Sequence, residues 1–371
     1  MLGRVGKYRL VEKIGEGGMG TVFRAEHTVL GSPAAVKILL PQWTQDAVVV
    51  DRFFHEAKAA SAIRHVGIVE VFDYGRLDNE QAWIAMELLR GETLTQFFAR
   101  NGGPPRMEPG GLGPTGSIDP AVVQQLAGQV LAALDAAHVV GVVHRDLKPD
   151  NLFLVRDPGL PGGIRVKVLD FGIAKLANDR FGQKRNTEGG TILGTPVYMA
   201  PEQCKGHGEV DARADLYALG CIMFELLAGR PPFDAPGGGE TMAMHIYEPP
   251  PRLANFAPQL PQDLDALVMR LLIKNPAERP PSAAYTLAAL ERVPLLPMAA
   301  QIVQLPGGGR APTYGPPVHP DGGPLTQYLP PRPPPREGLP LWVPIVVLLV
   351  ALAIAAAAVV LIGGSDVDVP K

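Results

Sequence analysis

One short polar stretch constrains this chain more than any other feature, because its residues make chemical sense only where a fold gathers them at one site. Residues 144–151 read His-Arg-Asp-Leu-Lys-Pro-Asp-Asn. Asp146 can accept a hydroxyl proton, Lys148 can neutralise phosphate charge, and Asn151 can hold a divalent cation. Asp170, the first residue of an Asp-Phe-Gly triplet, lies nineteen residues after Asn151 and offers a second carboxylate for a metal. The pattern predicts phosphoryl-transfer chemistry.

A glycine-rich segment far upstream fits the same chemistry. Gly15, Gly17 and Gly20 match the spacing G-x-G-x-x-G, and Val22 follows them. Glycine lets backbone N–H groups approach phosphate oxygens because it has no Cβ. A dinucleotide-binding motif or a plain hairpin can show this spacing, but the dinucleotide motif needs a strand and then a helix. Here strand-like residues flank the glycines on both sides, so we interpret the segment as a cover for ATP phosphates.

The chain reads as strand-rich first and helix-rich afterwards. Apolar alternation predicts strands in the first part, interrupted by one helix that would bury Phe53, Ala57 and Ala60 on one face. Asp119 followed by Pro120 predicts the N-terminus of a long helix, as N-cap and first-turn residue. The predicted strands cover residues 8–14, 21–26, 34–39, 69–74 and 83–88, and the predicted helices cover 46–63, 119–140, 212–227, 260–273 and 282–291.

These motifs, in this order, resemble the protein kinase family, and in particular its bacterial-type, eukaryotic-like serine/threonine branch. The resemblance covers residues 8–293. It implies an α+β, two-lobed protein kinase fold, with a strand-rich N-lobe over about residues 8–90 and a helical C-lobe over about residues 91–293. It also implies transfer of the ATP γ-phosphoryl group to Ser or Thr hydroxyls of protein substrates.

The resemblance implies ATP and Mg²⁺ as cofactors, with Mn²⁺ as an alternative ion. Lys37 would pair the α- and β-phosphates, and a buried ammonium needs a partner carboxylate. Glu56 is the best match for that partner, ahead of Asp46, Asp51 and Glu70. The residues that would surround the nucleotide, including the gatekeeper Met86 and the hinge, are Ile14, Gly15, Glu16, Gly17, Gly18, Met19, Gly20, Val22, Ala35, Lys37, Glu56, Met86, Glu87 and Leu89.

By the same resemblance, Asp146 would be the catalytic base that orients the acceptor hydroxyl. Lys148 would sit on the γ-phosphate, which is typical of the Ser/Thr branch. Asn151 and Asp170 would hold Mg²⁺, for which oxygen ligands are suitable. His144 would be a structural residue near the Asp-Phe-Gly triplet.

More distant matches concern the structure around this site. Glu202 ends an Ala-Pro-Glu triplet and would be buried against Arg279. Asp215 resembles the helix residue that anchors the backbone of the catalytic loop. Small-molecule phosphotransferases usually lack this segment, so these matches disfavour that alternative.

Arg145 would be a buried cation on which a phosphothreonine could dock. Thr187 and Thr191 lie between the Asp-Phe-Gly triplet and the Ala-Pro-Glu triplet and are the candidate phosphosites. The hypothesis is activation by autophosphorylation in trans, for which a homodimer is a candidate partner arrangement.

The rest of the chain predicts a membrane anchor. Residues 294–340 form a Pro/Gly-rich, disordered juxtamembrane linker. Residues 341–362 contain no Asp, Glu, Lys or Arg and, as a helix, would span about 33 Å, which matches a bilayer core. Residues 363–371 would be a short extracytoplasmic tail. Residues 102–117, and the shorter 156–163, interrupt the main domain without helix or strand periodicity; the first is predicted to be a disordered loop.

Composition excludes some classes of function but indicates none. The formal net charge of −3 gives no indication of nucleic-acid binding. Cys204 and Cys221 fit no metal site or disulfide framework, which favours a reducing compartment. We therefore expect a single-pass protein of the inner (plasma) membrane with a cytoplasmic kinase domain. The alternative is a membrane-tethered pseudokinase scaffold.

Overall fold

The computed structural model describes residues 3–102, 107–108, 111–112, 117–171, 196–206 and 210–294. The chain divides into two units, Met1–Gly309 and Arg310–Lys371, and all described residues belong to the first. Within the described residues, no helix is both long and apolar enough to cross a membrane. The predicted span at 341–362 and the phosphosites Thr187 and Thr191 lie outside the described residues.

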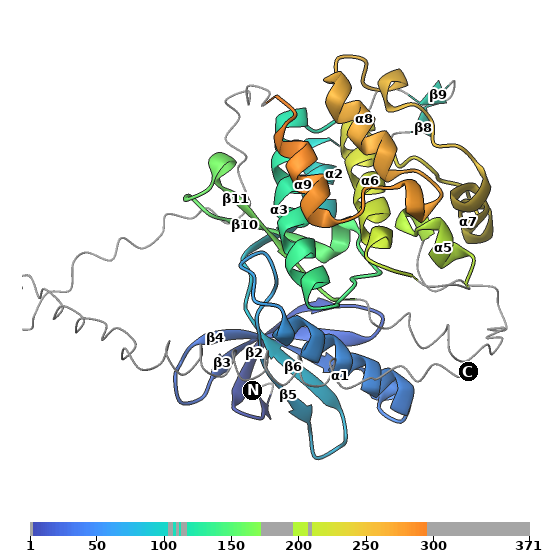
Figure 1. Ribbon diagram of the computed structural model, residues 1–371. Coiled ribbons are helices and arrows are strands. Elements are labelled where there is room, and N and C mark those ends of the chain that lie inside the picture. The colour runs from blue at the N-terminus through green and yellow to red at the C-terminus, as the bar shows by residue number, and fades with distance from the viewer. Residues whose placement is uncertain are drawn as a thin grey trace, which may run out of the picture. The chain divides into compact units, whose positions relative to one another are not determined.

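The first lobe is a six-stranded antiparallel sheet with the strand order β1-β2-β3-β4-β6-β5 (Figure 1). Side chains alternate between its two faces, as the two-residue period of a strand requires. Val36 and Ala85 pack in a cluster with Tyr8 on one face, whereas Leu39 and Ile84 pack in another cluster on the opposite face. The strands are β1 (Arg4–Val5), β2 (Tyr8–Glu16), β3 (Gly20–His27), β4 (Pro33–Leu39), β5 (Val71–Arg76) and β6 (Ala82–Met86).

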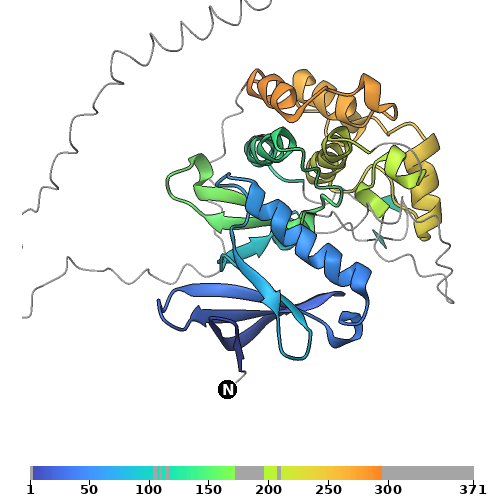
Figure 2. The same cartoon turned by 60° about the horizontal axis from the view of Figure 1, so that its bottom comes forward.

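Helix α1 (Ala47–Ala62) covers the second face of this sheet. The carboxylate of Asp46 accepts hydrogen bonds from the first free amides of the helix, which fixes where the helix begins. Phe53, Ala57 and Ala60 are buried, as the sequence predicted. Figure 2 shows α1 running between the strands of the sheet and the helical lobe.

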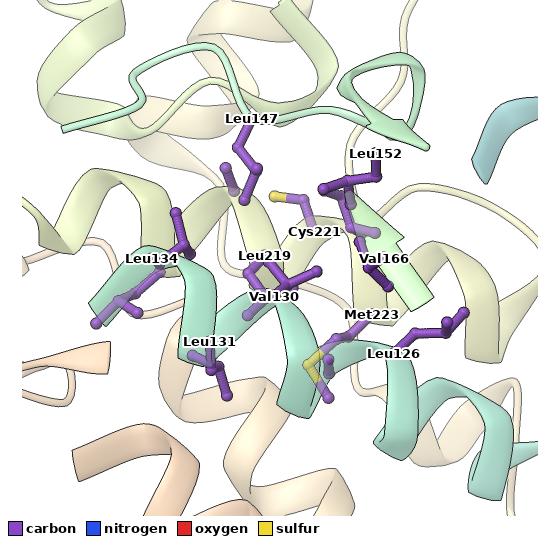
Figure 3. Close-up of a cluster of buried hydrophobic side chains, with 14 of the residues drawn as sticks. Leu126, Val130, Leu131, Leu134, Leu147, Leu152, Val166, Leu219, Cys221 and Met223 are labelled. Carbon is purple, nitrogen blue, oxygen red and sulfur yellow. The ribbon is translucent and has the colours of Figure 1, made fainter. Parts of the chain in front are cut away.

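The second lobe is built around α6, which is buried along almost its whole length. In Figure 3 the side chains of α3, among them Leu126, Val130 and Leu134, lie among those of α6, including Leu219 and Met223. A helix buried on all sides makes a rigid support for any polar side chain that it carries. The helices are α2 (Leu94–Asn101), α3 (Pro120–Val139), α5 (Pro201–Cys204), α6 (Arg213–Ala228), α7 (Gly238–Tyr247), α8 (Gln262–Leu271) and α9 (Ala283–Glu291).

A three-stranded sheet in the order β11-β10-β7 lies where the lobes meet. Its strands are β7 (Gly91–Thr93), β10 (Leu152–Arg156) and β11 (Ile164–Val168). Gly91 must be glycine, because an added Cβ would lie 1.8 Å from the carbonyl oxygen of Leu154. Val168 joins the lobes through two backbone hydrogen bonds, donating to Gly67 (2.7 Å) and accepting from Val69 (3.2 Å).

One predicted interruption differs from expectation, and the other forms the predicted loop. The described part of residues 102–117 contains a two-stranded pairing of β8 (Met107–Glu108) with β9 (Gly111–Leu112), so the prediction of a loop without strands is wrong there. The segment 156–163 forms a turn in which the Asp157 carboxylate accepts hydrogen bonds from the Gly159 amide (2.9 Å) and Arg165 Nε (2.6 Å). Local backbone pairing and polar contacts of this kind do not depend on apolar periodicity, so the sequence pattern did not indicate them.

Candidate active site

The β2–β3 hairpin carries the glycine motif. The amide of Gly17 donates to the carbonyl of Gly20 over 2.9 Å, which closes the turn. A Cβ on Gly20 would lie 2.8 Å from the carbonyl oxygen of Ile38 in β4, so the close approach of these strands requires glycine at that position. At Gly17 and Gly18 an added Cβ would meet no atom within 4 Å. The tip of the hairpin is therefore open around these two residues.

Lys37, in the middle of β4, forms an ion pair with Asp170, with 3.0 Å between Nζ and Oδ1. This contact joins the sheet lobe to the Asp-Phe-Gly segment. Glu56 on α1 lines the same pocket as both groups. Within the described residues Lys37 forms no ion pair with Glu56, which corrects the predicted pairing for this conformation. Asp170 is the more accessible partner, since its side chain is 47% exposed.

The charges of this cluster act on one another. Burial alone would lower the pKa of Lys37, but the carboxylates of Asp170 and Glu56 outweigh it and the pKa is raised. Burial raises the pKa of Glu56 to about 7; Lys37 opposes that rise, while Asp170 and Asp146 add to it. Burial and the neighbouring carboxylates thus favour the protonated form of Glu56, whereas the two carboxylates favour the charged form of Lys37.

A small pocket opens beside this cluster. Its apolar wall comes from α1, β5 and β6, and it includes Met86, the predicted gatekeeper. Ala35 lies opposite Met86 in the pairing of β4 with β6, and Val22 lies opposite Lys37 in the pairing of β3 with β4. The structure thus brings the predicted adenine-facing side chains onto neighbouring strands. The remaining lining residues are Glu56, Ala57, Ala60, Val69, Val71, Ile84, Asp170 and Phe171.

The predicted hinge follows β6 directly. The amide of Glu87 donates to the carbonyl of Glu70 over 2.9 Å, and the Glu87 carboxylate pairs with Lys167 of β11 at 2.6 Å. Lys167 was not among the predicted site residues, because a single lysine in a strand pattern gives no signal of its partner. The ion pair fixes the hinge against the second lobe.

The catalytic-loop stretch brings its three predicted groups into direct contact. Lys148 Nζ donates to Asp146 Oδ2 over 2.9 Å. The side-chain Nδ2 of Asn151 donates to the backbone carbonyl of Asp146 at 2.8 Å and lies 3.4 Å from Asp146 Oδ2. The Asp146 side chain is 36% exposed, so the carboxylate is both held and accessible. Such a group can orient a hydroxyl and accept its proton.

Asp215 of α6 anchors the backbone of this loop. Its two carboxylate oxygens accept from the amides of His144 and Arg145, each over 2.8 Å. Arg145 has φ of 63°, a left-handed conformation that is uncommon for a residue other than glycine. Asp215 is 1% exposed and stands on the most deeply buried helix of the domain, so it can hold this backbone in place.

Two histidines complete the anchor. His144 Nε2 donates to the Leu169 carbonyl at 2.8 Å, while its Nδ1 accepts from the Asp146 amide at 3.3 Å. Its ring centroid lies 4.9 Å from that of Phe171, as expected for a structural residue. His138 Nε2 lies 2.8 Å from Asp215 Oδ2. Sequence reasoning missed His138, whose only signal is its place near the end of a predicted helix shortly before the polar stretch.

Glu202 and Arg279 form a bidentate ion pair, with 2.7 Å from Nη1 to Oε1 and 2.8 Å from Nη2 to Oε2. The Arg279 side chain is 0% exposed. Its other donor contacts go to the carbonyls of Ile273, Arg213 and Lys274, so both terminal nitrogens and Nε are hydrogen-bonded. This pair fixes the segment that follows the predicted phosphosites to the core of the second lobe.

The sheet lobe, the helical lobe and a polar cluster between them define a protein kinase fold. The family model described as "Protein kinase domain" matches residues 8–289, and the chain belongs to this family. The chain is 43% identical over 288 residues to the serine/threonine-protein kinase Pkn1 of Myxococcus xanthus, covering 78% of this chain and 38% of that protein. It is 36% identical over 331 residues to the serine/threonine-protein kinase PknH of Mycobacterium tuberculosis, covering 88% of this chain and 49% of the relative.

Among solved structures, the PknI kinase domain of Mycobacterium tuberculosis matches with a TM-score of 0.56 and 31% identity, covering 77% of this chain and 95% of that one. These findings confirm the predicted bacterial-type serine/threonine protein kinase domain and its two-lobed fold. The chain spans about half or less of the length of these two curated relatives.

Proposed function

We propose that this chain is a serine/threonine protein kinase, which transfers the γ-phosphoryl group of ATP to Ser or Thr hydroxyls of proteins. One observation carries the proposal: Lys37 of the sheet lobe pairs with Asp170 beside a pocket, and Asp146, Lys148 and Asn151 are joined to one another on the loop between the lobes. Positioning and charge stabilisation are what phosphoryl transfer requires of a protein. The relatives named as serine/threonine kinases support the acceptor class.

In this proposal Asp146 orients the acceptor hydroxyl and takes up its proton. Lys148, hydrogen-bonded to Asp146, stands where it can neutralise charge on the transferred group. Lys37 binds the inner phosphates, and its ammonium stays charged because its pKa is raised despite burial. Asp215 acts indirectly, since it fixes the backbone from which Asp146 projects.

The donor set suits Mg²⁺, with Mn²⁺ as the alternative ion. The cluster holds the carboxylates of Glu56, Asp146 and Asp170 against the ammonium groups of Lys37 and Lys148. The side-chain nitrogen of Asn151 donates to the Asp146 carbonyl, so the side-chain oxygen of Asn151 is available as a ligand. Oxygen ligands and an excess of negative charge are what a hard divalent cation selects. When bound, the cation would neutralise charge on the phosphates, with Asn151 and Asp170 as its ligands.

The test is phosphotransfer from radiolabelled ATP to a mixture of protein acceptors, followed by phosphoamino-acid analysis. We expect label on Ser and Thr, and loss of transfer in Asp146→Asn. Label confined to Tyr, or to a small molecule, would contradict the acceptor class. Nucleotide binding with no transfer in the wild-type chain would support the pseudokinase scaffold instead.

We also propose that phosphorylation at Thr187 or Thr191 activates the domain. Arg145 supports this, because its backbone is held by Asp215 and its guanidinium donates to the Val210 carbonyl at 3.1 Å, close to the catalytic loop. Phosphopeptide mapping of the wild-type chain, with Asp146→Asn mixed in as an inactive substrate, tests modification in trans between two copies. Absence of phosphate from both threonines would contradict it.

Residues 341–362 are our proposed membrane anchor, with the kinase domain on the cytoplasmic side of the inner (plasma) membrane. Their length and freedom from charged residues support the proposal. Membrane fractionation of the full chain against a chain truncated after residue 340 tests it. Equal release of both into the soluble fraction would contradict an anchor.

A further inference from the structure

The tip of the glycine hairpin is tied to the segment that follows β4. The amide of Leu40 donates to the Met19 carbonyl over 2.9 Å. The indole Nε1 of Trp43 donates to the Gly18 carbonyl over 3.1 Å. We call these two hydrogen bonds the tether. Their donors, Leu40 and Trp43, are not among the predicted site residues. The second contact depends on the identity of one side chain, whereas the first is made by backbone atoms alone.

Trp43 stands on a short, well-fixed turn. The 3₁₀ turn η1 (Pro41–Trp43) begins with a proline, and the amides of Trp43 and Thr44 donate to the carbonyls of Leu40 (3.0 Å) and Pro41 (3.1 Å). The Trp43 carbonyl then accepts from the amide of Asp46 at 3.2 Å. Because Asp46 caps α1, and α1 carries Glu56, the tether joins the nucleotide cover to the helix behind the pocket.

Met19 strengthens the same junction. Its side chain and that of Trp43 both pack against the cluster of Leu39, Phe53 and Ala57 between β4 and α1. Gly17 and Gly18, which precede Met19, have no side chains, and an added Cβ at either would meet no atom within 4 Å, so they contribute no packing of their own. The position of the tip therefore depends on these few contacts.

Fixing the Gly18 carbonyl also fixes the direction of a donor. A trans peptide is planar, so the N–H of Met19 points opposite to the carbonyl that Trp43 holds. That N–H belongs to the loop that would cover the phosphates. The tether thus turns a carbonyl oxygen, which would repel a phosphate, toward Trp43, and the amide away from it.

We propose that Trp43 is a positioning residue that presets the glycine hairpin for the phosphates of a bound nucleotide. The proposal rests on the proposed function only in taking the ligand to be a nucleoside triphosphate or diphosphate. Its consequence is selective: the indole N–H supports nucleotide binding, and it contributes little to acceptor binding or to the chemical step.

Trp43→Phe keeps an aromatic ring and removes the donor. Loss of one such hydrogen bond should raise the KM for ATP about three- to tenfold. The kcat and the KM for the protein acceptor should change less than about twofold, since the catalytic loop is held from the other lobe by Asp215. Thermal unfolding of each variant checks that the lobe remains folded.

Trp83→Phe is the matched control. Trp83 lies in the same lobe and is buried, but its Nε1 has no hydrogen-bond partner within the described residues. Removing that N–H therefore breaks no hydrogen bond, and the KM for ATP should stay at the wild-type value. An unchanged or lowered KM in Trp43→Phe, or an equal rise in Trp83→Phe, would overturn the proposal.

A binding measurement separates this proposal from the proposed function. Titration with ADP, followed by calorimetry, should give a dissociation constant about three- to tenfold higher in Trp43→Phe than in the wild type and in Trp83→Phe. If this difference is found but the wild type transfers no phosphoryl group, the kinase activity fails and the role of Trp43 stands. An equal dissociation constant in Trp43→Phe and the wild type would overturn the role of Trp43 alone, and no ADP binding by the wild type would overturn both.

Discussion

Lys37 and Arg279 are both cations that face a carboxylate: Lys37, in the sheet lobe, is largely buried, and Arg279, in the helical lobe, is fully buried. Arg279 meets Glu202 through two hydrogen bonds, and its remaining donor contacts reach backbone carbonyls. Lys37 makes a single contact with Asp170, whose side chain is 47% exposed, while Glu56 lies in the same pocket. The first pair has one arrangement that satisfies every group, whereas the second has two carboxylates competing for one ammonium.

The contrast between the two ion pairs separates a structural role from a role in the chemistry. A bidentate pair whose arginine is fully buried holds a segment in place, and loss of the arginine leaves a largely buried carboxylate without its cation. A single, partly exposed pair beside a pocket can exchange its partner when a ligand arrives. The helical lobe therefore supplies the fixed frame, including Asp215 and the catalytic loop, and the sheet lobe supplies the adjustable groups around the nucleotide.

The largest effect on stability is expected at the fixed pair. Arg279→Met should lower the free energy of unfolding by about 3–5 kcal/mol, because Glu202 is left buried without its cation. Chemical denaturation measures this. The control is Arg9→Met at the exposed pair with Glu26, which spans 2.6 Å and should cost less than about 1 kcal/mol. Similar losses at both positions would remove the distinction drawn here.

At the adjustable pair the expected effect is on turnover. Lys37→Met should reduce kcat by about 10²-fold or more, since a charge aimed at the phosphates is lost. The free energy of unfolding should change by less than about 1 kcal/mol, because Asp170 is well solvated. Steady-state kinetics and denaturation on one preparation test both parts. A loss of stability as large as that of Arg279→Met would show that this pair, too, is structural.

A smaller effect is expected within the glycine hairpin. Gly20→Ala should cost about 1–3 kcal/mol, because its Cβ would lie 2.8 Å from the backbone oxygen of Ile38. Gly17→Ala, where an added Cβ meets nothing within 4 Å, is the matched control and should leave stability nearly unchanged. Thermal unfolding compares the two variants. Equal shifts in Tm would contradict the close-approach argument.

A pH dependence is expected at Glu56. Its pKa is raised from the ordinary value of 4.5 to about 7, chiefly by burial. Between these values the folded domain binds the extra proton, so this contribution to stability is present below pH 4.5 and is lost as the pH rises through 7. Relative to Glu56→Gln, the wild type should lose about 3 kcal/mol over that interval, at about 1.4 kcal/mol per pKa unit. A difference between the two that stays constant with pH would exclude the raised pKa.

Much of the fold follows from local patterns. The predicted strands and helices lie within two residues of β2, β3, β4, β5, β6, α1, α3, α6, α8 and α9. These elements combine clear apolar periodicity with recognisable ends, such as Asp46 and Asp119. The strands β10 and β11 and the helices α2 and α7 were not predicted, because short segments packed between larger elements carry little periodicity of their own.

The residues and contacts of the candidate site also divide into those that the sequence could predict and those that it could not. Residue types within one motif, such as Asp146, Lys148 and Asn151, could be assigned from the sequence, and their mutual contacts agree with that assignment. The partner of Lys37 could not, because burial and competing charges decide between Glu56 and Asp170. The contact from Trp43 to the Gly18 carbonyl also left no trace in the sequence, since a side chain bonded to a distant backbone oxygen follows no periodic rule.

The central claim is that Asp146 takes part in the chemistry while other groups hold the nucleotide. The most direct test measures the dissociation constant of Mg·ATP and the turnover number of the same Asp146→Asn protein. We predict an unchanged dissociation constant, within about twofold, and a turnover reduced by about 10²- to 10⁴-fold. Turnover equal to that of the wild type would contradict the account, because phosphoryl transfer would then occur without the carboxylate around which this site is built.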